Sequence, residues 1–280
     1  MRRLLLPVIL LTGLANADEP NSDHFLNTDV FELEVAADPQ ISPDGSRIVY
    51  VRRSNDIMID RARSNLWIVD AEGGQHRPVV SGTDSYTSPR WSPDSTRIAY
   101  VSSAEGRGPE LYVRWMNTGQ TALLSNLATS PSGIAWSPDG NWIAFSALVK
   151  GEKASPAKAP AKPEGAEWAP PVTYIDDIYY RADGRGYLET GFTHIFVIPA
   201  EGGTPRQVTS GDFNHGGQLA WSPDGETIVF SANRNDDWEY RTRNSDLWSV
   251  NIDSGELTQL TTRDGPDTSP TFSPDGSKIA

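Results

Sequence analysis

The chain has 280 residues, a formal net charge of −13 and no cysteine. The negative charge argues against nucleic acid and anionic membrane surfaces as partners, because both repel an acidic protein. We interpret the charge as a source of solubility rather than as a sign of a specific cationic partner. The lack of cysteine excludes disulfides and thiolate metal sites.

The first 17 residues differ in character from the rest of the chain. Two arginines precede an apolar run, and Ala15-Asn16-Ala17 has the small-x-small pattern of a cleavage site. This order predicts a secretory signal peptide over residues 1–17. The alternative is a short membrane anchor, but an apolar run of about 11 residues is too short to cross a bilayer. We therefore expect an exported protein, periplasmic or secreted, without a membrane span.

The tetrapeptide Ser-Pro-Asp-Gly, or a one-residue variant of it, occurs five times. Successive copies begin 50, 45, 85 and 51 residues apart. A repeat of this period indicates one supersecondary unit copied in series. The copies begin at Ser42, Ser92, Ser137, Ser222 and Ser273.

Each tetrapeptide lies between two apolar segments rich in β-branched and aromatic residues. A large apolar residue precedes the serine, and a run such as Ile48-Val49-Tyr50 follows after two residues. The flanks therefore predict strands and the tetrapeptide predicts the turn that joins them, in which Pro fixes φ and Gly adopts a left-handed φ. Ser95 occupies the position of that Gly in the second copy, where we expect some backbone strain.

A third strand and a short fourth strand follow each hairpin, for example Leu66–Val69 and Pro78–Val80 after the first. Four short antiparallel strands in this period are typical of one blade of a β-propeller. We predict an all-β fold, a β-propeller built of four-stranded antiparallel blades. Four blades and the start of a fifth are present, so the ring is incomplete.

The 85-residue interval predicts an insertion of about 38 residues in one blade, near residues 148–190. Its first part, Lys150 to Val172, is rich in Ala, Lys, Glu and Pro, which predicts an extended surface loop. The next part, Tyr174 to Gly184, is more apolar and aromatic. We expect that part to pack back on the propeller.

The usual catalytic signatures do not occur in the chain. It has no Gly-x-Ser-x-Gly, no His-Glu-x-x-His, and no glycine-rich dinucleotide or phosphate motif. The turn aspartates lack the alternating carboxylates of a calcium loop. We therefore expect no metal, no cofactor and no catalytic residue within this sequence.

A few polar residues remain as candidates. His194 reads as a structural residue of a third strand, and His215 as a loop residue that could face the propeller channel. The adjacent carboxylates Asp176-Asp177 and Asp236-Asp237 could do acid–base work or hold a substrate amine. Solvated turn residues are the commoner explanation for such pairs.

The last residue, Ala280, lies inside the second strand of the fifth unit. A domain that ended there would leave an unpaired strand edge and an open ring. We expect the sequence to be a fragment of a longer protein.

Five segments of the chain carry a combined pattern. The segments are Asp38–Gly45, Asn65–Asp70 with Gly73-Gly74, Tyr180–Tyr187, Thr209–His215 and Ser231–Asp237. The combination resembles the N-terminal propeller of the prolyl oligopeptidase family of serine peptidases, and is most similar to the acylaminoacyl-peptidase and dipeptidyl-peptidase-5-like branch. The Tyr-Arg-x-Asp-Gly-x-Gly-Tyr segment that follows the insertion carries the most specific likeness.

The resemblance implies a two-domain enzyme that hydrolyses short peptides. The propeller would screen substrates by size above a C-terminal α/β-hydrolase domain with a Ser, Asp and His triad, which is expected but absent from this chain. For substrate binding it suggests Asp176, Asp177, Arg181, Arg234 and Asp236.

Two other functions remain open. One is a non-catalytic periplasmic binding module of the Tol type, whose blades share the tetrapeptide but usually have a more regular period. The other is a peptidase homologue that has lost its activity and acts as a scaffold.

Overall fold

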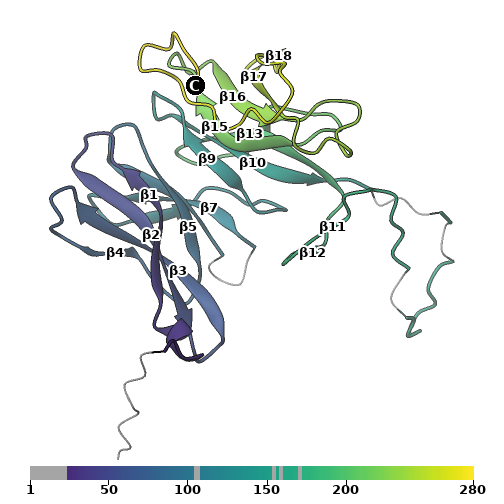
Figure 1. Cartoon of the computed structure of the whole chain (residues 1–280), viewed down its shortest axis with the longest axis horizontal. Helices are drawn as coiled ribbons and strands as arrows, with labels where there is room; N and C mark the ends of the chain where they lie inside the picture. Colours follow the sequence, from purple (N-terminus) through teal and green to yellow (C-terminus); the bar gives the residue numbers. More distant parts are fainter. Residues whose placement is uncertain (1–23, 104–107, 153–155, 158–159, 170–171) are drawn as a thin grey trace, which may run out of the picture.

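The structure, a computed structural model, describes residues 24–103, 108–152, 156–157, 160–169 and 172–280. The predicted signal peptide lies outside these residues. Four antiparallel sheets of four strands follow one another along the chain, each with its strands in chain order (Figure 1). This arrangement confirms the predicted all-β propeller blades.

The strands of the four blades have the following bounds. The first blade contains β1 (Glu34–Ile41), β2 (Arg47–Asp56), β3 (Arg61–Asp70) and β4 (Arg77–Val80). The second contains β5 (Tyr86–Trp91), β6 (Arg97–Ser102), β7 (Glu110–Trp115) and β8 (Thr121–Leu123). The third contains β9 (Ser132–Trp136), β10 (Trp142–Lys150), β13 (Gly191–Pro199) and β14 (Arg206–Gln207). The fourth contains β15 (His215–Trp221), β16 (Thr227–Ala232), β17 (Asp246–Asn251) and β18 (Leu257–Gln259).

Little of the described chain lies outside these sheets. A 3₁₀ helix, η1 (Asp29–Phe31), precedes β1. After β18, Phe272 and Ile279 form an antiparallel bridge around the fifth tetrapeptide, so the predicted start of a fifth blade is confirmed. No helix in the described part of the chain is long and apolar enough to cross a membrane.

A side-chain network closes each Ser-Pro-Asp-Gly turn. In the third copy, the Ser137 hydroxyl donates to Asp139 Oδ1 at 2.5 Å and accepts from the Trp142 N–H at 2.9 Å. Asp139 Oδ1 also accepts from the Asn141 N–H. The Ser137 hydrogen bond holds the pKa of Asp139 below its usual value, so the carboxylate is the favoured form. The predicted strain at Ser95 is confirmed, since its φ is +59°.

The hydrophobic cores lie between consecutive blades. Val49 and Leu66 of the first blade pack with Trp91 of the second, and the same arrangement joins the second blade to the third and the third to the fourth. Each blade therefore buries its faces against its neighbours, which is why one blade alone has no complete core.

Tryptophans join the first strands of successive blades. Trp136 Nε1 on β9 donates to the Arg90 carbonyl on β5 at 3.0 Å. Trp91 bonds in the same way to Gln40 on β1, and Trp221 to Ala135 on β9. This Trp ladder places β1, β5, β9 and β15 side by side.

The insertion leaves the third blade between β10 and β13. These strands pair along their full length, from the pair Trp142 and Pro199 to the pair Lys150 and Gly191. Residues 151–190 therefore leave the blade and return to it at the same end of this strand pair. The insertion contains the two-stranded hairpin β11 (Arg181–Ala182) and β12 (Gly186–Tyr187), which projects away from the blades (Figure 1).

The expectation that the aromatic part of the insertion packs back on the propeller is wrong. Its large side chains are between 42% and 57% exposed. Tyr180 stacks on Tyr187 within the insertion itself, with ring centroids 6.2 Å apart. The exposed side chains are Tyr174, Ile175, Ile178, Tyr179 and Tyr180.

Candidate functional site

All five candidate substrate-binding residues lie at one end of the blades. Because strands in a blade alternate in direction, the Ser-Pro-Asp-Gly turns share one end, and the segments that join second to third strands share the other. We call this second end the loop face. It contains residues 57–60, the insertion 151–190 and the loop 233–245.

Asp176 and Asp177 are exposed and lie in an irregular stretch of the insertion, before β11. Arg181 begins β11 and pairs in register with Tyr187. In the described residues, no hydrogen bond or ion pair joins these three side chains to one another or to the other two candidates. The root of the insertion is fixed by an ion pair between Lys150 and Glu189 at 3.3 Å.

Asp236 is exposed in the turn that follows β16. The same turn carries Trp238, whose ring meets Phe192 of β13 edge-on, with centroids 6.3 Å apart. This contact connects the fourth blade to the strand that leaves the insertion. Asp236 is thus near the insertion root in the fold, although its own side chain faces solvent.

Arg234 is held more firmly than the other candidates. Its guanidinium carbon lies 4.8 Å from the centre of the Phe213 ring and 5.1 Å from the Trp248 ring. Its Nη1 lies 2.5 Å from Nε2 of His215. Two cation–π contacts and one hydrogen bond therefore fix the side chain.

His215 continues this contact into the third blade. It is fully buried at the start of β15, and its Nδ1 lies 3.1 Å from Nδ1 of His194 on β13, which is 4% exposed. A guanidinium can only donate, so His215 Nε2 must accept and its proton resides on Nδ1. Nδ1 then donates to His194 Nδ1, which places the His194 proton on Nε2.

Both imidazoles are held neutral. Burial lowers the pKa of His215 to about 3, and the charge of Arg234 acts in the same direction. Burial also lowers the pKa of His194, although Asp212 partly opposes the shift. With its Nε2 lone pair committed to Arg234, His215 is not placed to accept a proton from a substrate.

A buried polar residue in the third strand, as His194 is in β13, also occurs in the second and fourth blades. Glu110 begins β7 and accepts from the Ser125 hydroxyl at 2.6 Å, and Asp246 begins β17. In three blades, the residue that directly follows this polar residue donates its backbone N–H to the hydroxyl of a Ser or Thr that lies 14 residues further along the chain. The pairs are Leu111 with Ser125, Ile195 with Thr209 and Leu247 with Thr261.

Sequence reasoning did not find the joined cluster of His194, His215 and Arg234. It treated each histidine separately, because the residues belong to different strands and their contact depends on how two blades pack. The constant spacing of 14 residues between a third-strand residue and a later Ser or Thr was the one signal in the sequence that marks the position of the buried polar residue in each blade.

Two hollows open on the loop face. One, of about 470 Å³, lies between the third and fourth blades and is lined by His215, Asn233 and a ring of neutral polar side chains. These include Ser132, Ser146, Thr193, Asn214, Gln218 and Ser231.

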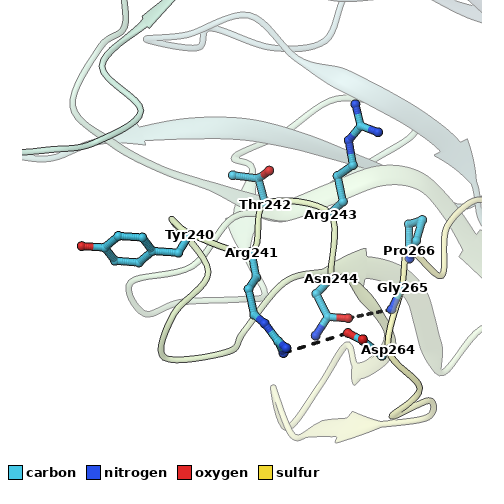
Figure 2. A pocket seen from close by; sticks show the side chains of 8 residues that line it. All are labelled: Tyr240, Arg241, Thr242, Arg243, Asn244, Asp264, Gly265 and Pro266. Atoms are coloured by element: carbon cyan, nitrogen blue, oxygen red, sulfur yellow. Dashed lines mark hydrogen bonds and ion pairs between the residues drawn. The ribbon is translucent and has the colours of Figure 1, made fainter.

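The other hollow, of about 450 Å³, lies between the loop after β16 and the segment after β18. Figure 2 shows that Arg241 reaches toward Asp264, with Nη1 and Oδ1 4.0 Å apart, while the Tyr240 ring extends away from these two side chains. The Gly265 N–H donates to Asn244 Oδ1 at 2.8 Å. The Arg241 cation of this hollow already has a carboxylate beside it.

Two known families match successive parts of the chain. The family described as TolB beta propeller domain matches residues 44–154. The family described as Dipeptidyl peptidase IV (DPP IV) N-terminal region matches residues 182–280. The second match includes His194, His215, Arg234 and the hairpin of the insertion apart from its first residue, Arg181.

Individual proteins extend the comparison. The Uncharacterized peptidase YuxL of Bacillus subtilis is 32% identical over 206 residues, which are 73% of this chain and 30% of that protein. Dipeptidyl-peptidase 5 of Porphyromonas endodontalis is 27% identical over 252 residues, 84% of this chain and 35% of that protein. The chain thus spans about a third of the length of these relatives.

Among solved structures, the acylaminoacyl peptidase of Pyrococcus horikoshii superposes with a TM-score of 0.60 at 16% identity, covering 84% of this chain and 33% of that one. At this identity the likeness shows the fold alone.

Proposed function

The chain carries the N-terminal propeller blades of a prolyl oligopeptidase-family peptidase, and from that premise we propose that it is the substrate-gating part of an exported serine peptidase. The enzyme hydrolyses short peptides, as an acylaminoacyl-peptidase or a dipeptidyl peptidase does. The observation that carries the proposal is the match of residues 182–280 to the dipeptidyl peptidase IV N-terminal region, because this segment contains the loop 233–245 and the end of the insertion, residues 182–190, on the loop face.

The catalytic chemistry belongs to residues beyond this chain. Since the chain spans about a third of its relatives, a C-terminal α/β-hydrolase domain with Ser, Asp and His fits the remaining length. Residues 1–17 serve as the signal peptide that exports the enzyme. The blades then act as a filter that admits short peptides to the shared cavity.

On this proposal the loop face makes the substrate contacts. Asp176 and Asp177 offer carboxylates to the free amine of a peptide, and Arg181 follows them at the start of β11. Arg234 and Asp236 lie on the neighbouring blade. Opposite charges on two blades suit a short peptide, whose two ends are themselves charged at neutral pH.

A non-catalytic binding module of the Tol type is the second candidate. The match of residues 44–154 to the TolB beta propeller domain favours it. The insertion at 151–190 counts against it, because a propeller that acts only as a binding module usually has a more regular period.

Steady-state kinetics of the full-length protein test the proposal. We expect hydrolysis of free-amine dipeptidyl p-nitroanilides, and a KM raised about tenfold by Asp176→Ala or Asp177→Ala, since each removes a charge-assisted hydrogen bond. Asp183→Ala, in the turn between β11 and β12, is the matched control and leaves KM unchanged.

No hydrolysis by the full-length protein would contradict the peptidase function. Hydrolysis with an unchanged KM in both variants would instead contradict only the role of the two aspartates.

A further inference from the structure

Two stacked arginines in the described part of the chain have no ion pair, Arg47 and Arg234. Arg47 lies over Trp91 and donates to the Ser95 backbone carbonyl at 3.0 Å. Arg52 stacks on Trp67 and pairs with Glu34, and Arg97 stacks on Trp136 and pairs with Glu201 at 2.9 Å. The polar partner of Arg234 is instead an imidazole. No ion pair of Arg234 occurs among the described residues.

The imidazole cannot balance this charge. His215 is neutral, and its own partner His194 is neutral too, so the cluster carries one net positive charge from the guanidinium. Burial lowers the pKa of Arg234 below its ordinary value, and no neighbouring carboxylate opposes the shift. The cation is thus partly desolvated and has no ion pair among the described residues, although the charge of Asp212 acts on His194 in the same cluster.

The geometry leaves the remaining donors of Arg234 available. A guanidinium has five N–H groups in a rigid fork, and among the described residues the one hydrogen bond of the Arg234 fork goes to His215. Nη1 of Arg234 donates to Nε2 of His215, and this hydrogen bond fixes the orientation of the guanidinium fork. Such an edge matches a planar carboxylate better than it matches a neutral carbonyl, because two parallel bonds can form.

The surroundings suit a peptide. His215 and Asn233, the hydrogen-bond partner and the chain neighbour of Arg234, line the hollow of about 470 Å³ between the third and fourth blades. Its other lining side chains are neutral hydroxyls and amides, which bond to peptide groups without competing for the cation.

We propose that Arg234, oriented by His215 and the two rings, is the receptor for a carboxylate of a peptide bound beside this hollow, which its neighbours His215 and Asn233 line. That the ligand is a peptide rests on the proposed function. That the recognised group is a carboxylate rests on the geometry of the Arg234 cluster alone. The carboxylate is either the C-terminus of the peptide or the side chain of an Asp or Glu within it, and the test below separates these sources.

Calorimetric titration of the full-length protein at low ionic strength tests the site. The probes are acetyl-triglycine, its C-terminal carboxamide, and acetyl-Gly-Glu-Gly-amide, each recovered and checked as intact by mass spectrometry. We expect at least one of the two carboxylate peptides to bind about tenfold or more tightly than acetyl-triglycine amide. The peptide that does so identifies the source of the carboxylate.

Three variants locate the effect. Arg234→Gln reduces the affinity for the carboxylate peptide to that for the amide, and Arg234→Lys, which keeps the charge but loses the fork, falls between. Arg243→Gln, an exposed arginine of the same loop, keeps the full preference. If Arg234→Gln does not fold, Arg234→Lys carries the test, since a site that needs the fork must weaken there.

Equal binding of all three peptides by the unmodified protein would overturn the proposal, as would a carboxylate preference that survives Arg234→Gln and Arg234→Lys. The titration measures binding and not turnover. A protein that prefers the carboxylate peptide but hydrolyses no peptide would therefore support the carboxylate site and contradict the proposed peptidase function.

Discussion

At the scale of single residues, polar side chains in the blades have two different tasks. The Ser and Asp of each turn satisfy backbone groups within one hairpin, which lowers the pKa of Asp44 and Asp275 to about 2. His194, by contrast, joins a different blade through His215. The first task follows from neighbours in the sequence, whereas the second arises only when two blades pack.

The histidine pair makes the fold sensitive to acid. An imidazole that is free in the unfolded chain has a pKa of about 6.5, whereas that of His215 in the fold is about 3. The unfolded state therefore binds the proton first, so stability that is present above about pH 6.5 declines as the pH falls toward 3.

The prediction is a loss of thermal stability between about pH 7 and about pH 5 that depends on His215. In His215→Gln, which starts from a lower melting temperature at neutral pH, the further drop on acidification is smaller. Circular dichroism melts at the two pH values measure both changes. His76→Gln, which alters an exposed histidine of the first blade, is the control. An equal drop in all three proteins would contradict the assignment.

At the scale of elements, the Trp ladder explains why a tryptophan precedes the second, third and fourth tetrapeptides. The ring fills the space between two blades, and its N–H satisfies a carbonyl of the preceding first strand, as Trp221 does for Ala135. Phe272 fills the same position in the fifth unit and has no such donor.

We expect Trp136→Phe to lower the free energy of unfolding by about 1–2 kcal/mol, because the Arg90 carbonyl loses its donor while most of the apolar contact remains. Urea denaturation followed by circular dichroism measures the loss. Trp168→Phe, in the exposed insertion, should change stability by less than about 0.5 kcal/mol. Equal effects of the two substitutions would show that the ladder contributes nothing.

At the scale of the whole molecule, the repeat predicted the blades and the place of the insertion, because strand alternation and turn chemistry are local properties. It did not predict the Trp ladder or the His194–His215–Arg234 cluster. Their members are distant in sequence, and their contacts depend on the relative position of two sheets. The exposed aromatic segment of the insertion was predicted to be packed, since composition alone does not show whether a surface is available to cover it.

The loop face gives the molecule its functional asymmetry. One end of the blades is closed by repeated turns, while the other carries the insertion, the hollow and Arg234, which has no ion pair among the described residues. On the proposed function, this asymmetric surface admits some peptides and excludes others.

Labelling with a fluorophosphonate probe tests the central claim most directly, since this reagent forms a covalent bond with an activated serine. The account predicts that the full-length protein is labelled and that residues 18–280 expressed alone are not. A full-length protein that stays unlabelled under conditions where a known serine peptidase reacts would contradict the account and favour a binding module.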